Sequence, residues 1–173
     1  MGVKDGFMEA NLVTKLSFCI VLFAVIINWI AFCTTSWFLV SGVNYYGLWR
    51  ACTATTCGSM LDGSPDDDIN AIQAFAIFGF MGLNVGFFLI VMYMFWGSCK
   101  GNGETGLAAA ISLLVSAGCW LIAVAIFGSK YDDYSVGRFG YSFALAVIAL
   151  ILALVVGILM VVGGRGNSSV SSK

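Results

Sequence analysis

The chain has 173 residues, of which 60% are hydrophobic and 10% are charged, and it carries a net charge of −1 with no histidine. The lack of a basic excess excludes an electrostatic surface for nucleic acid, and the lack of histidine removes the side chain that most often serves as catalytic base or metal ligand. We therefore expect neither nucleic acid nor a bound cofactor or metal.

Four apolar stretches cover most of the chain and contain no Asp, Glu, Lys or Arg; they lie at about 16–36, 71–97, 107–128 and 139–163. A helix needs about 20 apolar residues to span the hydrocarbon core, so each stretch is long enough. Each is also apolar on all sides, unlike the amphipathic helices of a soluble core. The sequence thus predicts one mainly α membrane domain over residues 1–173, with four spans in contact with the lipid bilayer.

The first loop, residues 37–70, carries strand signals. Phe38-Leu39-Val40 and the segment from Tyr45 to Ala51 are rich in β-branched and aromatic residues, and the segment from Cys52 to Cys57 can continue the second strand and return as a third. Two cysteines at this spacing can face each other across a hairpin, and closing so short a loop stabilises it by roughly 2 kcal/mol. A metal site is the alternative, but the other ligands are missing. We expect a small antiparallel sheet with one disulfide.

The same loop holds more apolar side chains than a small sheet can bury. Some of them are expected to contact lipid or a partner. The candidates are Phe38, Leu39, Val40, Tyr45 and Tyr46.

Small residues recur at four-residue spacing in the later spans. Lipid is as apolar as the side chains, so helices in a membrane associate through close packing at such residues. These positions are expected to hold the bundle together rather than to bind a ligand: Gly82 and Gly86 in the second span, Ser112 and Ser116 in the third, and Ala149, Ala153 and Gly157 in the fourth.

Two observations place both termini in the cytoplasm. Basic residues are retained on the cytoplasmic side of a membrane, and this orientation puts five inside and three outside. Those inside are Lys4, Lys15, Lys100, Arg165 and Lys173, and those outside are Arg50, Lys130 and Arg138. A disulfide also persists only on the oxidising side. Residues 37–70 and 129–138 are then extracellular loops, and 98–106 and the tail 164–173 are cytoplasmic.

One motif resembles the signature of a known family. It consists of Trp37 at the outer end of the first span, then Gly47, Leu48 and Trp49, and then Cys52 and Cys57. This pattern resembles the claudin superfamily, which groups claudins with peripheral myelin protein, the epithelial membrane proteins, the lens fibre membrane intrinsic protein and the γ subunits of calcium channels. Tyr141-Ser142-Phe143 is similar to the start of the fourth span in that family.

The resemblance implies a left-handed bundle of four transmembrane helices crowned by a sheet, with one strand supplied by the second outer loop. It assigns the family disulfide to Cys52 and Cys57 and places Trp49 at the membrane surface. The two cysteines are closer together than in claudins, so we expect a reduced sheet. The last residue, Lys173, is not the hydrophobic residue that a PDZ scaffold requires, so such a scaffold is not an expected partner.

An enzyme is not expected, because the spans offer no ionisable group and the loops no histidine. By resemblance, the leading hypothesis is a plasma-membrane protein of cell–cell contacts. It would associate with itself or with related tetraspans, in the same membrane and across the gap, for adhesion or as a paracellular barrier. The alternatives are an auxiliary subunit of an ion channel or receptor, and a lipid-organising tetraspan like the myelin branch.

Overall fold

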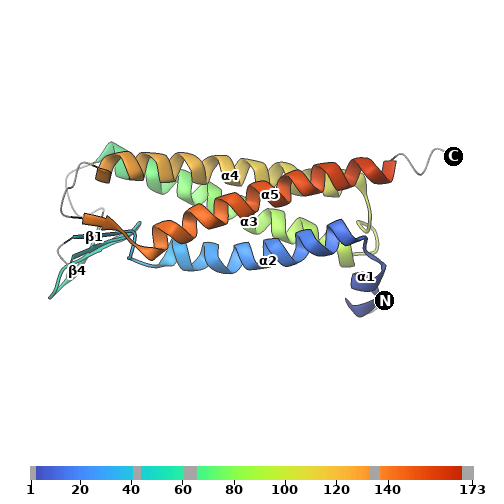
Figure 1. Ribbon diagram of the computed structural model, residues 1–173, viewed down its shortest axis with the longest axis horizontal. Helices are drawn as coiled ribbons and strands as arrows, with labels where there is room; N and C mark the ends of the chain where they lie inside the picture. Colours follow the sequence, from blue (N-terminus) through green and yellow to red (C-terminus); the bar gives the residue numbers. More distant parts are fainter. Residues whose placement is uncertain (1–2, 41–43, 61–65, 133–136, 169–173) are drawn as a thin grey trace.

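The protein is a bundle of four long helices with a small sheet at one end (Figure 1). The computed structural model describes residues 3–40, 44–60, 66–132 and 137–168. The bundle helices are α2 (Leu12–Cys33), α3 (Asp67–Phe95), α4 (Gly103–Asp132) and α5 (Tyr141–Ser168), and a short helix α1 (Val3–Glu9) precedes them. All four are long and apolar enough to cross a membrane, as the sequence predicts. Tail residues 169–173, including Lys173, lie outside the described residues.

Capping groups set the helix ends, which differ from the expected spans by several residues. The Asn11 side chain accepts a hydrogen bond from the Thr14 N–H (3.0 Å), so α2 begins at Leu12 rather than at residue 16. The Asp66 carboxylate accepts from the N–H groups of Asp68 and Ile69, so α3 begins at Asp67 rather than at residue 71.

The third and fourth spans also differ from expectation. The helix α4 runs beyond 107–128 at both ends and takes up the first residues of the expected loop 129–138. The expected fourth span begins at residue 139, but residues 137–139 form a strand and α5 begins at Tyr141. Strand pairing with the first loop, rather than hydrophobicity, therefore decides where α5 starts.

Small residues let α3 and α4 approach closely. A Cβ added at Gly82 would lie 3.0 Å from the Ser116 Cβ. The Ser112 hydroxyl donates to the Gly82 carbonyl (2.8 Å), and the Ser116 hydroxyl donates to the Gly79 carbonyl (2.5 Å). These interhelical hydrogen bonds need the close backbone approach that glycine permits.

The other small residues also lie on buried faces. A Cβ at Gly86 would lie 2.6 Å from the Leu113 side chain, and one at Gly157 would lie 2.9 Å from Leu114. Ala149 and Ala153 are fully buried in the same core. The bundle core is thus built from small residues of α3 and α5 against α4.

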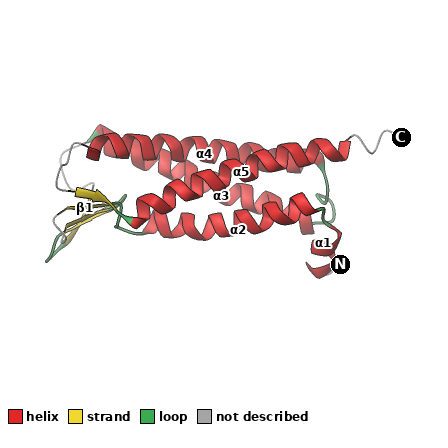
Figure 2. Ribbon diagram, viewed as in Figure 1, coloured by secondary structure: helices red, strands yellow, loops and turns green. Residues whose placement is uncertain are grey.

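The sheet has five antiparallel strands in the order β4-β3-β2-β1-β5. They are β1 (Phe38–Val40), β2 (Asn44–Tyr46), β3 (Arg50–Cys52), β4 (Cys57–Ser59) and β5 (Gly137–Phe139). The strand β5 comes from the loop between α4 and α5 and pairs with β1, as the resemblance implies. Figure 2 shows all the strands at one end of the bundle, with α1 and the end of α5 at the other.

The expected second strand, Tyr45 to Ala51, is two strands in the structure. The Gly47 N–H donates to the Arg50 carbonyl (2.9 Å), and this turn separates β2 from β3. A Cβ at Gly47 would lie 2.6 Å from the Thr35 Cα, so only glycine fits here. The turn places Leu48 and Trp49 against the bundle instead of in the sheet.

Candidate functional site

Two tryptophans anchor the sheet to the end of α2. The last carbonyl groups of a helix have no partner within the helix. The Trp37 indole N–H donates to the Ala31 carbonyl (2.9 Å), and the Trp49 indole N–H donates to the Phe32 carbonyl (3.0 Å). Trp37 is fully buried, whereas Trp49 is half-buried and its ring packs edge-on against Phe32. The two indole N–H groups of the motif therefore satisfy carbonyl groups in the last turn of the first span.

A third hydrogen bond joins the turn between β2 and β3 to α3. The Gln73 side chain donates to the Leu48 carbonyl (2.9 Å), and both residues are almost fully buried. Sequence reasoning did not assign Gln73 a structural role. The signal that could have found it is a lone amide near the outer end of an apolar span, because a buried amide needs a partner.

The strand β5 and the start of α5 are fixed to the residues around Trp37. The Gly140 N–H donates to the Trp37 carbonyl (2.9 Å), and the Ser142 N–H donates to the Ser36 carbonyl (3.1 Å). A Cβ at Gly140 would overlap the Ser36 carbonyl oxygen, so the backbones meet directly. The strand β5 and the start of α5 are therefore joined directly to the segment that follows α2.

An aromatic cluster fills the space between the sheet and α4. Its members are Trp37, Phe38, Trp120, Phe127 and Tyr131. The Trp37 and Phe127 ring centroids are 5.0 Å apart, and those of Phe127 and Tyr131 are 4.6 Å apart. Aromatic pairs at these distances stabilise a core beyond their buried area.

Phe38 was among the residues expected to contact lipid or a partner, but it is buried inside the protein. It is 1% exposed, and its ring lies 4.8 Å from that of Tyr131 and 5.5 Å from that of Phe139. Leu39, Val40, Tyr45 and Tyr46 are half-buried. Cross-strand partners share one face of a sheet, so Leu39 and Tyr45 lie on the face opposite to Phe38 and its partner Tyr46.

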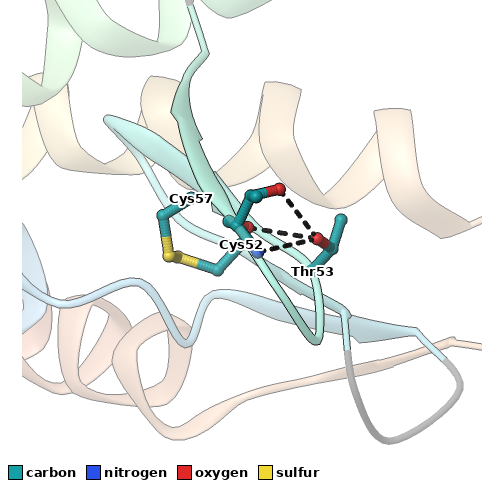
Figure 3. The surroundings of a disulfide bond; sticks show 4 residues. Cys52, Thr53 and Cys57 are labelled. Atoms are coloured by element: carbon teal, nitrogen blue, oxygen red, sulfur yellow. Dashed lines mark hydrogen bonds between the residues drawn. A yellow bond between two sulfur atoms is a disulfide. The ribbon is translucent and has the colours of Figure 1, made fainter.

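The hairpin of β3 and β4 is the most exposed part of the sheet. Cys52 and Cys57 are paired directly across it and form a disulfide. The Thr53 N–H donates to the Thr56 carbonyl (2.8 Å), and the Thr53 hydroxyl donates to the same oxygen (3.1 Å). Figure 3 shows the disulfide and the hydrogen bonds of the Thr53 hydroxyl, which close the hairpin. Residues 53–59 are all exposed, so this hairpin presents a rigid, polar tip.

An ion pair joins α3 to α4 at the sheet end. The Lys130 ammonium lies 2.5 Å from the Asp66 carboxylate and 3.5 Å from that of Asp68. The hydrogen bond from Lys130 lowers the pKa of the Asp66 carboxyl below its ordinary value of 3.8. Within the residues that the structure describes, no group of three His, Cys, Asp or Glu side chains is placed to hold a metal ion.

Known proteins resemble this chain over most of its length. Residues 10–160 match the family model described as the PMP-22/EMP/MP20/Claudin family. The chain is 28% identical to Epithelial membrane protein 1 of Oryctolagus cuniculus, over 90% of this chain and 95% of that protein. It is 30% identical to Epithelial membrane protein 1 of Rattus norvegicus, over 73% and 81%. It is 27% identical to Epithelial membrane protein 2 of Danio rerio, over 79% and 87%.

Proposed function

Because the chain belongs to the PMP-22/EMP/MP20/Claudin family of membrane proteins, we propose that it is a plasma-membrane protein of cell–cell contacts. In this role it associates through its sheet with copies of itself or with related tetraspans, for adhesion or as a paracellular barrier. The role is structural rather than enzymatic.

The proposed orientation puts the sheet outside the cell and both termini inside. The start of α1 and the end of α5 lie at the end of the bundle opposite to the sheet (Figure 1). If each long helix crosses the membrane once, both of these ends lie on the side of the membrane opposite to the sheet. The Cys52–Cys57 disulfide supports the oxidising side for the sheet. The excess of basic residues supports the cytoplasmic side for the termini.

The exposed, pre-formed tip of the β3–β4 hairpin is the observation that carries this proposal. Binding costs less when the contacting segment is already ordered, because less conformational entropy is lost. The disulfide and the Thr53–Thr56 hydrogen bonds order the tip. The tryptophan anchors fix the sheet to the bundle, so the tip has a defined position relative to the membrane.

A glycan placed on the tip tests both the orientation and the contact. Ala54→Asn creates the acceptor Asn-Thr-Thr at residues 54–56, whereas Ala54→Gln adds a similar amide without an acceptor. We expect the Ala54→Asn variant to be glycosylated and the acceptor at 167–169 to stay bare; residue 169 lies outside the described residues. A glycan at 167–169 would overturn the orientation.

The same variants are then expressed in cells that lack junctional strands. Contacting membranes are examined by freeze-fracture and by crosslinking mass spectrometry. We expect the wild-type protein and the Ala54→Gln variant to accumulate where two expressing cells touch and to crosslink to themselves, and the glycosylated variant to lose both properties. Dispersed wild-type protein without self-crosslinks would contradict the contact function.

One observation favours the auxiliary-subunit function as a second candidate. Gly118 of α4 is exposed, and a Cβ added there would meet nothing within 4 Å. It lies between the exposed residues Val115 and Ile122 on a lipid-facing stripe. A small residue on such a stripe lets another helix approach closely. Crosslinks from α4 to one channel or receptor, in place of self-crosslinks, would favour this candidate.

A further inference from the structure

A cavity of about 300 Å³ lies where the sheet meets the start of α5. Its lining includes Leu39, Tyr45, Arg138, Phe139 and Tyr141. The volume is at the lower end of the range for small-molecule sites, so it suits a headgroup rather than a whole lipid. Of these residues, Phe139 also packs against Phe38 of the aromatic cluster, with ring centroids 5.5 Å apart.

Arg138 gives this cavity a positive charge. Its register partner is Leu39, which also pairs with Tyr45, so the three side chains form a row across one face of the sheet. Arg138 is exposed, and no ion pair with it occurs within the described part of the chain. A guanidinium presents a planar fork of N–H donors that fits phosphate oxygens two at a time.

Aromatic rings stand beside this charge. Tyr45 and Tyr141 line the cavity together with Arg138, and Tyr141 is 56% exposed. Faces of aromatic rings attract quaternary ammonium groups, and this is a common means of choline recognition. A phosphate-binding arginine next to two such rings is complementary to a group with adjacent negative and quaternary positive charges.

The cavity also lies at the level where a lipid headgroup would be. Tyr141 is the first residue of α5, whose span from Tyr141 to Gly163 is apolar enough to cross the membrane. Exposed apolar residues continue from it along α5 at Ile148, Ile151, Val155, Ile158 and Val162. Their spacing of three, four or seven residues keeps them on one side of the helix. Acyl chains along this stripe would bring a headgroup to the cavity.

We propose that this cavity binds the phosphocholine headgroup of a phospholipid, with the phosphate on Arg138 and the trimethylammonium group against Tyr45 and Tyr141. The assignment to the outer leaflet rests on the proposed extracellular position of the sheet. The binding itself does not, because it is measured on purified protein without cell contacts. Failure of the contact function would therefore leave this test unaffected.

The test uses the purified full-length chain in detergent, with bound lipids counted by native mass spectrometry. Three probes with the same acyl chains separate the chemical requirements: phosphatidylcholine, phosphatidylglycerol, which lacks the quaternary ammonium group, and a diacylglyceryl trimethylhomoserine, which lacks the phosphate. We expect phosphatidylcholine to bind more tightly than either of the other two. Equal binding of phosphatidylcholine and phosphatidylglycerol would overturn the proposal.

Two arginine variants provide the matched comparison. Arg138→Gln should weaken phosphatidylcholine binding by about tenfold or more, as expected when a charge-assisted hydrogen bond is lost. Arg50→Gln removes the same charge from an exposed position on β3 that does not line the cavity, and it should bind like the wild type. Helical content by circular dichroism and a thermal unfolding temperature in detergent equal to those of the wild type show that each variant is folded.

Removing the rings tests the other half of the site. Tyr45→Leu and Tyr141→Leu should each reduce the preference for phosphatidylcholine over phosphatidylglycerol while leaving phosphatidylglycerol binding unchanged. Equal lipid binding by the Arg138→Gln and Arg50→Gln variants would overturn the proposal. So would a loss of self-association in the Arg138→Gln variant with no change in lipid binding, because the cavity would then be a contact between copies of this chain.

Discussion

The side-chain amide of Gln73 donates a hydrogen bond of 2.9 Å to the carbonyl oxygen of Leu48, joining the second span to the turn between β2 and β3. Both groups are buried, so the carbonyl has no access to water if the amide is removed. Together with the indole donors of Trp37 and Trp49, this bond makes the sheet an extension of the bundle. These three side-chain hydrogen bonds fix the residues that flank the strands to α2 and α3.

Gln73→Met should loosen this end of the sheet. The substitution keeps the length of the side chain but leaves the Leu48 carbonyl unsatisfied, at a cost of about 1–3 kcal/mol. Trypsin cleavage after the exposed Arg50 reports local opening of the sheet, and we expect it to be faster in the variant. Asn70→Leu changes an exposed amide one turn earlier in α3 and should cleave like the wild type. Unchanged cleavage in the Gln73→Met variant would show that the bond does not hold the turn.

Cys52→Ser or Cys57→Ser should loosen the hairpin without unfolding the helices. Closing this short loop stabilises the sheet by roughly 2 kcal/mol. Both cysteines lie in strands of the sheet, so the helices do not depend on the disulfide. We expect lower cell-surface expression, measured by surface biotinylation, with helical content by circular dichroism unchanged. Cys33→Ser changes an exposed free cysteine at the end of α2 and serves as the control. A loss of helical content comparable to full unfolding would contradict this account.

Local composition was enough to predict the four spans. The strand signals and the two closely spaced cysteines of the first loop were enough to predict a small sheet with one disulfide, and the family resemblance added the strand from the second outer loop. Two further features depend on contacts between distant segments. Phe38 is buried because Tyr131 and Phe139 reach it from the end of α4 and from β5, and its own neighbours in the sequence do not reveal this. The role of Gln73 likewise depends on where the turn at Leu48 is placed. Hydrophobicity also could not locate the helix ends that Asn11 and Asp66 set by capping.

Asp66→Asn isolates the charge of the ion pair with Lys130, because asparagine is an equally good helix cap. The pKa of Asp66 is lowered in the folded protein, so its charge stabilises the fold above the ordinary value of 3.8 and stops doing so as the pH falls through the folded pKa. The wild type should exceed the variant in thermal stability at about pH 6, and the difference should shrink as the pH falls below the ordinary value of 3.8.

The size of the stability difference between the wild type and Asp66→Asn follows from how far the ion pair is exposed to solvent. The side chains of Asp66 and Lys130 are 42% and 23% exposed, so solvent screens the pair and the expected contribution is below about 1 kcal/mol. Asp67→Asn changes a neighbouring exposed carboxylate and is the matched control. A stability difference for the Asp66→Asn variant that did not change between neutral and acidic pH would assign the effect to capping rather than to charge.

Gly82→Leu and Gly118→Leu compare a glycine in a helix–helix contact with a glycine that has open space beside it. At Gly82 a Cβ would lie 3.0 Å from the Ser116 Cβ and 3.3 Å from the Ser112 carbonyl oxygen, so a leucine must push α3 and α4 apart and break the serine hydrogen bonds. We expect the Gly82→Leu variant to lose at least about 1–3 kcal/mol, measured as a lower thermal unfolding temperature in detergent.

At Gly118 nothing lies within 4 Å of the added Cβ, so the fold itself gives no reason for a glycine there. The Gly118→Leu variant should therefore unfold like the wild type. If it nevertheless loses crosslinks to a channel or receptor in cells, the glycine is needed for the approach of a partner helix, as the auxiliary-subunit function requires. If crosslinks and contact enrichment both remain, α4 carries no partner at this position. The stripe around Gly118 then faces only lipid, and association must occur through the sheet.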